Sequence, residues 1–209
     1  MFNPVKEGEN TVKQNGMRLT LMNSAIKVVA NAGLDKTTTK AIATDANLNE
    51  VYIYRTFEDK DDLLMSTFNS LDDELRSCIL TNLLDMEQRE IKGEESCWVF
   101  LENIWEHILS DYDKCIYFIR FYYSRFLDSY ANSVRKKKYS EVIEKMQPAF
   151  IEGTDVWTTL NYILGVMFSF AIKIIRGEDS EGNLTAEYVF RLIYAALQPQ
   201  MSWTQKKSA

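Results

Sequence analysis

Residues that break helices are scarce in this chain. Its 209 residues include only three prolines and eight glycines, the two residue types that most often interrupt a helix. Between these breaks, apolar residues recur at steps of three and four, which places them on one face of a helix. The clearest stripe predicts one long helix over residues 60–87, and it consists of Leu64, Phe68, Leu71, Leu75, Ile79, Leu83 and Met86. We therefore expect an all-α fold.

Short polar or glycine-containing breaks divide the rest of the chain. We expect a first helix over residues 18–32, ending before Gly33, and two short helices over residues 37–46 and 50–57. The periodicity predicts further helices over residues 95–110, 113–129, 132–150, 155–176 and 184–198. Residues 1–16 are polar and are expected to form a flexible tail, and the residues after Pro199 are expected to be frayed.

Composition limits the class of protein. Hydrophobic residues make up 46% of the chain and charged residues 26%, which is typical of a soluble globular protein. The three cysteines, Cys78, Cys97 and Cys115, have no metal-ligand spacing and are expected to be reduced thiols. The N-terminus lacks a signal-peptide pattern, and the apolar stretch 162–175 is shorter than the ~20 residues of a membrane span. We expect a cytoplasmic protein without a membrane partner.

The formal charge is unevenly distributed. Residues 1–57 contain seven Lys or Arg and five Asp or Glu, a charge of +2, which leaves −8 for residues 58–209 out of the total of −6. Because opposite charges attract, an anionic partner would contact the N-terminal quarter of the chain.

Residues 37–57 have the pattern of two short helices joined by a tight turn. Asn47 is a residue type that tolerates the left-handed backbone of such a turn. Asn49 is a good cap for the second helix, and Leu48 and Ile53 have the spacing of a hydrophobic staple. In that second helix Ile53 and Phe57 lie on one face and are expected to point inward. Two such helices with a third behind them form a helix-turn-helix, whose second helix enters the major groove of DNA.

Residues 21–64 resemble the DNA-binding domain of the TetR (tetracycline-repressor-like) family of bacterial transcriptional regulators. The resemblance rests on "ANAG" at 30–33, Thr37 with Thr38, Ile42 with Ala43, "IYRTF" at 53–57, and Lys60. It implies a helix-turn-helix DNA-binding domain over residues 1–60 and a larger helical domain over residues 61–209 that binds an effector and forms a homodimer. Three positions depart from the family pattern, since this chain has Asn47 in the turn, Val51 instead of a small residue, and Glu50 instead of a basic or neutral one.

The residues expected to contact double-stranded DNA lie on and around the two short helices. Hydroxyl, amide and cationic side chains contact phosphates, and arginine can also read guanine. The candidates are Thr38, Thr39, Lys40, Asn49, Glu50, Val51, Tyr52, Tyr54, Arg55 and Lys60. Capping is an alternative role for the threonines, and Glu50 would either be repelled by phosphate or accept a bond from a cytosine amino group.

The resemblance also implies an effector cavity among the C-terminal helices, which are rich in aromatic residues. Ligand pockets are mainly apolar with a few polar groups, so we expect a small hydrophobic effector, planar or aromatic, and neutral or cationic because the domain is acidic. The candidate lining residues are Trp98, Leu101, Trp105, His107, Tyr122, Phe126, Trp157 and Asn161, and packing in the core is the alternative for each ring.

No sequence pattern indicates catalysis. The chain has a single histidine, His107, and lacks a glycine-rich phosphate loop, a nucleophile elbow and metal-ligand spacing. We therefore expect neither an enzyme nor a bound metal or cofactor. The predicted function is a ligand-responsive transcriptional repressor that binds a palindromic operator as a homodimer. The alternative is a helical ligand-binding or adaptor protein without DNA binding, which Glu50 and the acidic charge favour.

Overall fold

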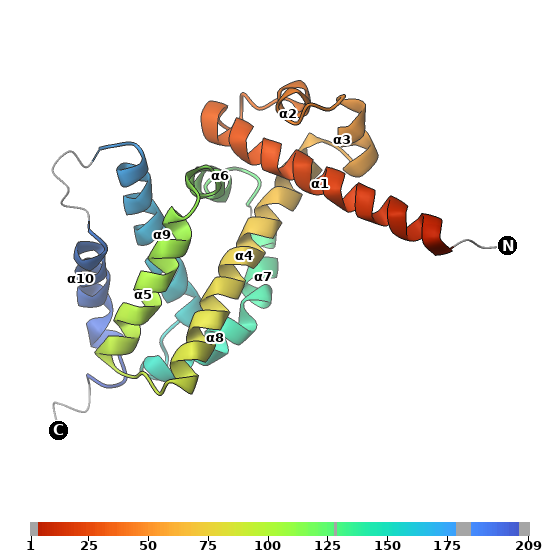
Figure 1. Ribbon diagram of the computed structural model, residues 1–209. Coiled ribbons are helices and arrows are strands. Elements are labelled where there is room, and N and C mark those ends of the chain that lie inside the picture. The colour runs from red at the N-terminus through yellow and green to blue at the C-terminus, as the bar shows by residue number, and fades with distance from the viewer. Residues whose placement is uncertain (1–3, 128, 179–184, 205–209) are drawn as a thin grey trace. The chain divides into compact units, whose positions relative to one another are not determined.

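The computed structural model describes residues 4–127, 129–178 and 185–204, and over these residues it contains helices and no β-strand. The α-helices and two 3-10 helices follow one another along the chain (Figure 1). Their bounds are α1 Pro4–Ala32, α2 Thr39–Asp45, α3 Val51–Thr56, α4 Lys60–Gln88, α5 Glu94–Leu109, α6 Tyr112–Tyr122, α7 Ser129–Lys138, α8 Ser140–Met146, η1 Gln147–Ala149, α9 Val156–Ile175, α10 Ala186–Leu197 and η2 Gln198–Gln200. The all-α prediction is confirmed.

The chain divides into two compact units. Unit 1 consists of Met1–Asp72 with Ile116–Phe126, and unit 2 consists of Asp73–Cys115 with Leu127–Ala209. The helices α4 and α6 therefore each contribute residues to both units. The predicted division into a DNA-binding domain up to residue 60 and an effector domain after it stays a prediction.

In unit 1, helix α1 packs against α2 and α3 (Figure 1). The core between them is mainly apolar and includes Leu21, Val29, Ile42 and Ile53, all shielded from solvent. The contact between α4 and α6 within this unit is aromatic. Phe68 of α4 stacks on Phe121 of α6 at a centroid distance of 4.7 Å. Burial of such apolar and aromatic surface is the main source of stability for these short helices.

Two polar contacts fix α6 within unit 1. The Tyr117 hydroxyl is buried and donates to the Leu64 carbonyl at 2.7 Å. The Arg120 guanidinium donates to the carbonyls of Val29 and Ala30 near the end of α1, the latter at 3.1 Å. Because the last carbonyls of a helix lack partners within it, a cation at this place satisfies them and complements the helix dipole.

In unit 2, helices α5, α9 and α10 pack against one another, and α8 packs against α9 (Figure 1). Ile104 of α5, Leu160 and Met167 of α9, and Ile193 of α10 are buried at their contacts. Helix α9 has 20 residues and a mean hydropathy of 1.5, so it is long and apolar enough to cross a membrane by length and composition alone. The stretch 162–175 considered in the sequence is only part of this helix, which begins at Val156, close to the predicted start at residue 155. Core helices of soluble proteins can have the same length and mean hydropathy.

Several predicted boundaries differ from the structure. The predicted tail is mostly helical, since α1 begins at Pro4, and its lysines, glutamates and glutamine are good helix formers. The helix predicted over 132–150 is interrupted at Tyr139, whose buried ring packs edge-on against Trp157 at 5.5 Å, and α6 ends at Tyr122 instead of continuing to residue 129. The segment after Pro199 is also ordered up to Thr204, because Met201 is buried and pairs with Phe150 in an antiparallel bridge.

Candidate functional site

Local capping builds the helix-turn-helix of unit 1. The Thr38 hydroxyl accepts a hydrogen bond from the Ala41 amide at 3.1 Å and so caps α2, whereas Thr37 donates to the Gly33 carbonyl at 2.7 Å. Asn47 has the predicted left-handed backbone, with φ of 53°. The Asn49 carboxamide accepts from the Val51 amide at 3.0 Å and so satisfies a free amide at the start of α3, although the N-cap position itself is Glu50. The turn thus depends on residue types that suit it sterically and satisfy the free amides of a helix start.

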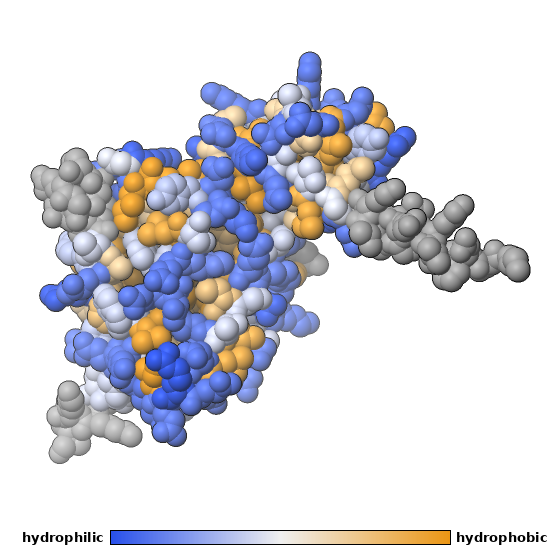
Figure 2. Space-filling model, in the orientation of Figure 1, coloured by the Kyte–Doolittle hydropathy of each residue, from blue (hydrophilic) through white to orange (hydrophobic). Residues whose placement is uncertain are grey.

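Helix α3 has one buried face and one exposed face. Ile53 and Phe57 are buried, as predicted. The side chains of Val51 and Tyr54 are 52% and 58% exposed, and Arg55 is exposed beside them with its guanidinium 5.6 Å from the Tyr52 ring centroid. Hydrophobic residues reach the surface in this region among hydrophilic ones (Figure 2). A short helix with an apolar inner face and an outer face of tyrosine and arginine has the chemistry of a DNA-contacting helix.

Glu50 and Thr39 interact with each other. The Thr39 hydroxyl donates to the Glu50 Oε1 atom, which links the start of α2 to the start of α3. Both side chains are partly buried. Glu50, which departs from the family pattern, therefore has a structural role, because its carboxylate links the two motif helices.

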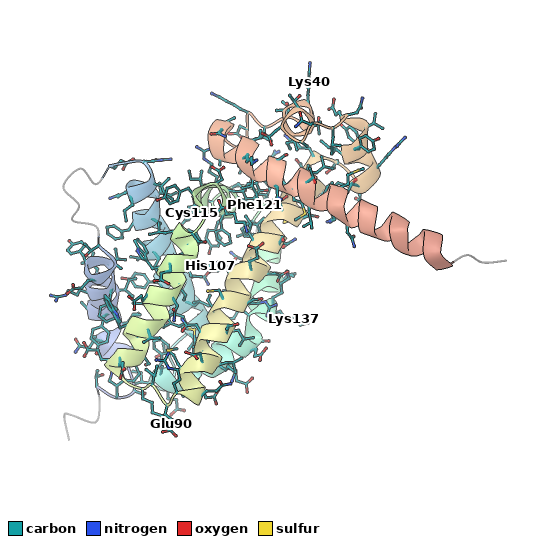
Figure 3. The ribbon with its side chains drawn as sticks, viewed as in Figure 1. Lys40, Glu90, His107, Cys115, Phe121 and Lys137 are labelled. Atoms are coloured by element: carbon teal, nitrogen blue, oxygen red, sulfur yellow. The ribbon has the colours of Figure 1, made fainter. Side chains whose placement is uncertain are left out.

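The two candidate lysines have different surroundings. Lys60 donates from its Nζ atom to the Thr37 carbonyl at 3.1 Å and so braces the loop before α2. Lys40 projects from α2 into solvent (Figure 3). The roles of all the predicted DNA-contacting residues stay predictions, but the structure brings them together on α2, α3, the adjacent turns and the first residue of α4.

Sequence analysis missed Arg18 of α1. Its Nη2 atom donates to the Ser66 hydroxyl at 2.9 Å, and its guanidinium lies 4.3 Å from the Phe57 ring centroid. A weaker bond of 3.4 Å reaches the Thr56 carbonyl. Arg18 therefore joins α1 to α4 and to the end of α3. The sequence signal for this contact was a cation, Arg18, on an otherwise partly apolar helix, together with an aromatic residue, Phe57, in the motif.

Three of the predicted effector residues meet in unit 2. Trp98, Leu101 and Trp105 lie on α5 and line a cavity of about 10 Å³, which is too small for an organic ligand. Trp98 packs edge-on against Phe190 of α10 at 4.6 Å. Leu101 and Trp105 are buried, whereas Trp98 is half-buried.

The other five predicted effector residues make contacts of their own within the two units. Trp157 and Asn161 both contact Arg135, whose guanidinium is 5.1 Å from the Trp157 ring and donates to Asn161 Oδ1 at 3.0 Å. Tyr122 and Phe126 belong to the aromatic cluster of unit 1. His107 lies on α5 (Figure 3), and partial burial lowers its pKa, an effect that Glu74 opposes and Lys114 reinforces. The effector-binding roles of all eight residues stay predictions.

A large pocket of about 830 Å³ opens elsewhere in unit 2. Of the predicted effector residues only Leu101 lines it. Its walls come from the end of α4, the loop to α5, the first half of α5, α8, η1, Ile163 of α9, α10 and the segment after η2. The volume lies in the range of pockets that bind small organic ligands. Among the described residues, no group of three His, Cys, Asp or Glu side chains is placed to hold a metal ion.

Comparisons with known proteins agree with this geometry. Residues 21–66 match the family described as "Bacterial regulatory proteins, tetR family". A TetR family transcription regulator from Marinobacter aquaeolei VT8 has a similar structure, with a TM-score of 0.71 and 16% identity over 89% of this chain and 97% of the other. The regulator FadR from Bacillus subtilis, in complex with stearoyl-CoA, gives a TM-score of 0.61 and 18% identity over 84% and 96%.

The multidrug binding protein EbrR, complexed with imidazole, gives a TM-score of 0.56 and 16% identity over 85% and 93%. No curated protein sequence matches the chain. The fold and the motif define a helical protein with an N-terminal helix-turn-helix. The family match assigns residues 21–66 to the TetR family of bacterial regulatory proteins, and the solved structures show that the chain shares the fold of TetR family regulators.

Proposed function

We propose that this chain is a transcriptional repressor that binds duplex operator DNA as a homodimer and is released by a small hydrophobic effector. The exposed face of α3 carries the proposal. Tyr54 and Arg55 are exposed there, while Ile53 and Phe57 fix the helix to unit 1 from the other side. Tyr54, Arg55, Lys40 and the free donors of Lys60 would contact phosphates or base edges. Residues 1–60 would form the DNA-binding domain and residues 61–209 the effector-binding and dimerisation domain.

The outer faces of α9 and α10 support dimerisation. The apolar helix α9 has only 39% of its most hydrophobic window buried. Tyr162 of α9 and Tyr188 and Leu192 of α10 are exposed large hydrophobic residues, and Figure 2 shows hydrophobic residues at the surface in the region of α9. Exposed apolar faces of this kind are typical of interfaces, and a symmetric pair of such faces forms an isologous contact. A symmetric dimer in turn requires a palindromic operator.

Sedimentation tests the dimer. We expect the wild-type protein to sediment as a dimer at micromolar concentration, and Leu192→Asp to shift it toward the monomer because an unpaired carboxylate would be buried. The matched control is Leu84→Asp on α4, since the exposed fractions of Leu84 and Leu192 are 37% and 41%. A monomeric wild type, or equal effects of the two substitutions, would contradict the interface.

The effector is the less specific part of the proposal. FadR was solved with stearoyl-CoA and EbrR with imidazole, so similar folds accept different ligands. The 830 Å³ pocket of unit 2 supports an organic effector here. Effector binding would shift the population between two states of different DNA affinity.

A second candidate function is a helical ligand-binding protein without DNA binding. The net charge of −6 and the carboxylate of Glu50 favour it. Selection of bound fragments from the host genome separates the two. We expect enrichment of palindromic fragments, and we expect Arg55→Ala to reduce binding while Lys137→Ala, which removes a cation from α7, leaves it unchanged. Absence of any enriched fragment would favour the second function.

A further inference from the structure

Two segments that are distant in the sequence form one wall of the large pocket of unit 2. The Ile151 amide donates to the Gln200 carbonyl at 2.9 Å, and the Ser202 amide donates to the Ala149 carbonyl at 3.0 Å. These bonds join the chain around η1 to the chain after η2, and both stretches contribute to the pocket lining. Because these backbone groups bond to one another, the side chains of this wall are what a ligand would contact.

The buried part of the pocket lining is entirely apolar. Its members are Met86, Phe100, Leu101, Met146, Phe150, Ile163, Ile193, Leu197 and Met201. Cys97 is half-buried in the lining, and burial, assisted by the nearby Glu94 carboxylate, raises the pKa of this thiol to about 12, so it stays neutral. The interior therefore suits an apolar body, and a charge placed deep inside would lose its hydration without gaining a counterion.

The hydroxyl groups of the lining already donate their protons within the chain. The bonds are those of Ser96 to the Gly93 carbonyl at 2.6 Å, of Ser202 to the Pro148 carbonyl at 2.9 Å and of Tyr194 to the Glu94 Oε2 atom at 3.3 Å. The Trp203 indole N–H is buried beside Tyr194 and is not open to the pocket. The lining has no hydroxyl or indole donor left for a ligand, so a ligand that only accepts hydrogen bonds gains little there.

The charged residues of the lining lie at its exposed rim. Glu87 forms an ion pair at 2.9 Å with the half-buried Lys145. Glu141 and Glu144 are exposed three positions apart on α8, and neither makes an ion pair or hydrogen bond within the part of the chain that the structure describes. Lys92 is the remaining cation of the lining. Two carboxylates against one ammonium group leave the rim with one excess negative charge.

The wider charge distribution acts in the same direction. Residues 58–209 carry −8, which is the total of −6 less the +2 of residues 1–57. A field of this sign attracts cations and repels anions. An ammonium group can stay hydrated at the rim while its carbon chain lies in the pocket, in the way that lysine side chains lie along apolar protein surfaces.

We infer that this pocket binds an amphiphilic amine, whose apolar body lies among the buried residues of the lining and whose ammonium group lies at Glu141 and Glu144 on the rim. The inference rests on the proposed function, because it names the chemical class of the proposed effector. The ammonium group supplies the hydrogen-bond donors that the lining lacks and the positive charge that balances the rim. A fatty acid would instead add another carboxylate beside the two that are already there.

Three fluorescent probes that share one body test this assignment on the full chain. Each is a dansyl sulfonamide with a pentyl chain, which ends in an ammonium group in dansylcadaverine, in an amide in N-acetyl-dansylcadaverine and in a carboxylate in 6-dansylaminohexanoic acid. We expect the ammonium probe to bind with blue-shifted emission, about 3-fold more tightly than the amide and about 10-fold more tightly than the carboxylate. Equal affinities, or tightest binding of the carboxylate, would overturn the inference.

Glutamine substitutions test the position of the ammonium group. Glu141→Gln and Glu144→Gln keep the side-chain shape, and each should weaken binding of the ammonium probe about 2- to 5-fold while changing that of the amide by less than about 1.5-fold. The matched control is Glu106→Gln, which removes an exposed carboxylate of α5 outside the pocket lining and should leave both affinities unchanged. If the three variants behaved alike, the rim contacts would be refuted.

Bulky substitutions locate the body of the probe. Ala149→Trp and Ser96→Trp place a large side chain in the lining from η1 and from α5, and each should abolish binding of all three probes. Gln147→Trp is the control, since Gln147 is exposed on the same 3-10 helix as Ala149 and does not line the pocket. Circular dichroism identifies the variants that are folded. Binding that survives in a folded Ala149→Trp or Ser96→Trp variant would overturn the inference.

DNA binding of the same preparations is measured separately by fluorescence anisotropy. Intact DNA binding without a preference for the ammonium probe refutes this inference alone. Preferred binding of the ammonium probe without DNA binding refutes the proposed repressor and leaves the ligand site standing.

Discussion

Replacement of Arg18 by methionine should destabilise unit 1 and displace α3. The substitution keeps much of the aliphatic side chain but removes the bond to Ser66 at 2.9 Å and the cation 4.3 Å from the Phe57 ring. A charge-assisted bond contributes about 1.5 kcal/mol at a partly buried site, and the cation–π contact adds about 0.5–1 kcal/mol. The 3.4 Å bond to Thr56 lies near the distance limit and adds little. We expect a loss of about 2 kcal/mol.

The positions of the tryptophans allow the two units to be followed separately. Trp98, Trp105, Trp157 and Trp203 all belong to unit 2, and unit 1 has none. Urea unfolding followed by far-UV circular dichroism reports both units, whereas tryptophan fluorescence reports unit 2. If the units unfold separately, Arg18→Met should lower the urea midpoint of the unit 1 transition, which circular dichroism detects and tryptophan fluorescence does not. If the units unfold together, the midpoint should fall by both measurements.

A matched substitution controls for the lost charge. Lys27 is exposed on the same helix, and its side chain makes no hydrogen bond or ion pair among the described residues. Lys27→Met should therefore change the free energy of unfolding by less than about 0.5 kcal/mol. If Arg18→Met and Lys27→Met had the same effect, the argument from the Arg18 contacts would be wrong. If Arg18→Met weakened DNA binding and Lys27→Met did not, the Arg18 contacts would be linked to the position of α3.

Other substitutions test single contacts. Lys60→Ala should flatten the salt dependence of DNA binding by roughly one unit per subunit, and an unchanged slope in anisotropy titrations would exclude a phosphate contact. Glu50→Gln should strengthen binding to random duplex DNA, since it removes a negative charge yet keeps an acceptor for Thr39; weaker binding would contradict this. Asn47→Val should cost about 1–2 kcal/mol in urea unfolding because Asn47 has φ of 53°, whereas Asn47→Gly should be nearly neutral. Because the pKa of His107 is lowered on folding, its protonation disfavours the folded state, so wild-type stability should fall as the pH decreases below about 6.5. The thermal stability of His107→Gln relative to wild type should then rise over that range, and a constant difference would refute the assignment.

Local chemistry made the helix-turn-helix predictable from the sequence. Asn47 and Asn49 act within a few residues of their own positions. The structure shows the expected left-handed backbone at Asn47 and a hydrogen bond from the Val51 amide to the Asn49 side chain. The predicted 60–87 helix ends within one residue of the observed α4, Lys60–Gln88. Capping and hydrophobic periodicity involve residues that are close together in the sequence, so both can be predicted from a single sequence.

Contacts between distant parts of the chain were not predictable in the same way. The large pocket brings α4, α5 and α8 together with Trp203, and the segment of Trp203 was expected to be frayed. Its order comes from hydrogen bonds to residues 149–151, about fifty positions earlier. The alternation of Met201 and Trp203 is typical of extended backbone and was the one available signal. The helix predicted over residues 95–110 correctly includes Trp98 and Trp105, but periodicity does not distinguish a packed helix face from a pocket wall.

Salt dependence of binding to duplex DNA tests the central claim most directly. An operator fragment enriched from the genome is titrated by anisotropy between about 50 and 300 mM salt, and log K is plotted against log salt concentration. Lys40, Arg55 and Lys60 supply three cations per subunit, so a dimer should give a straight line with a slope of about −5. Absence of binding at the lowest salt concentration, or a slope near zero, would contradict DNA recognition by this chain.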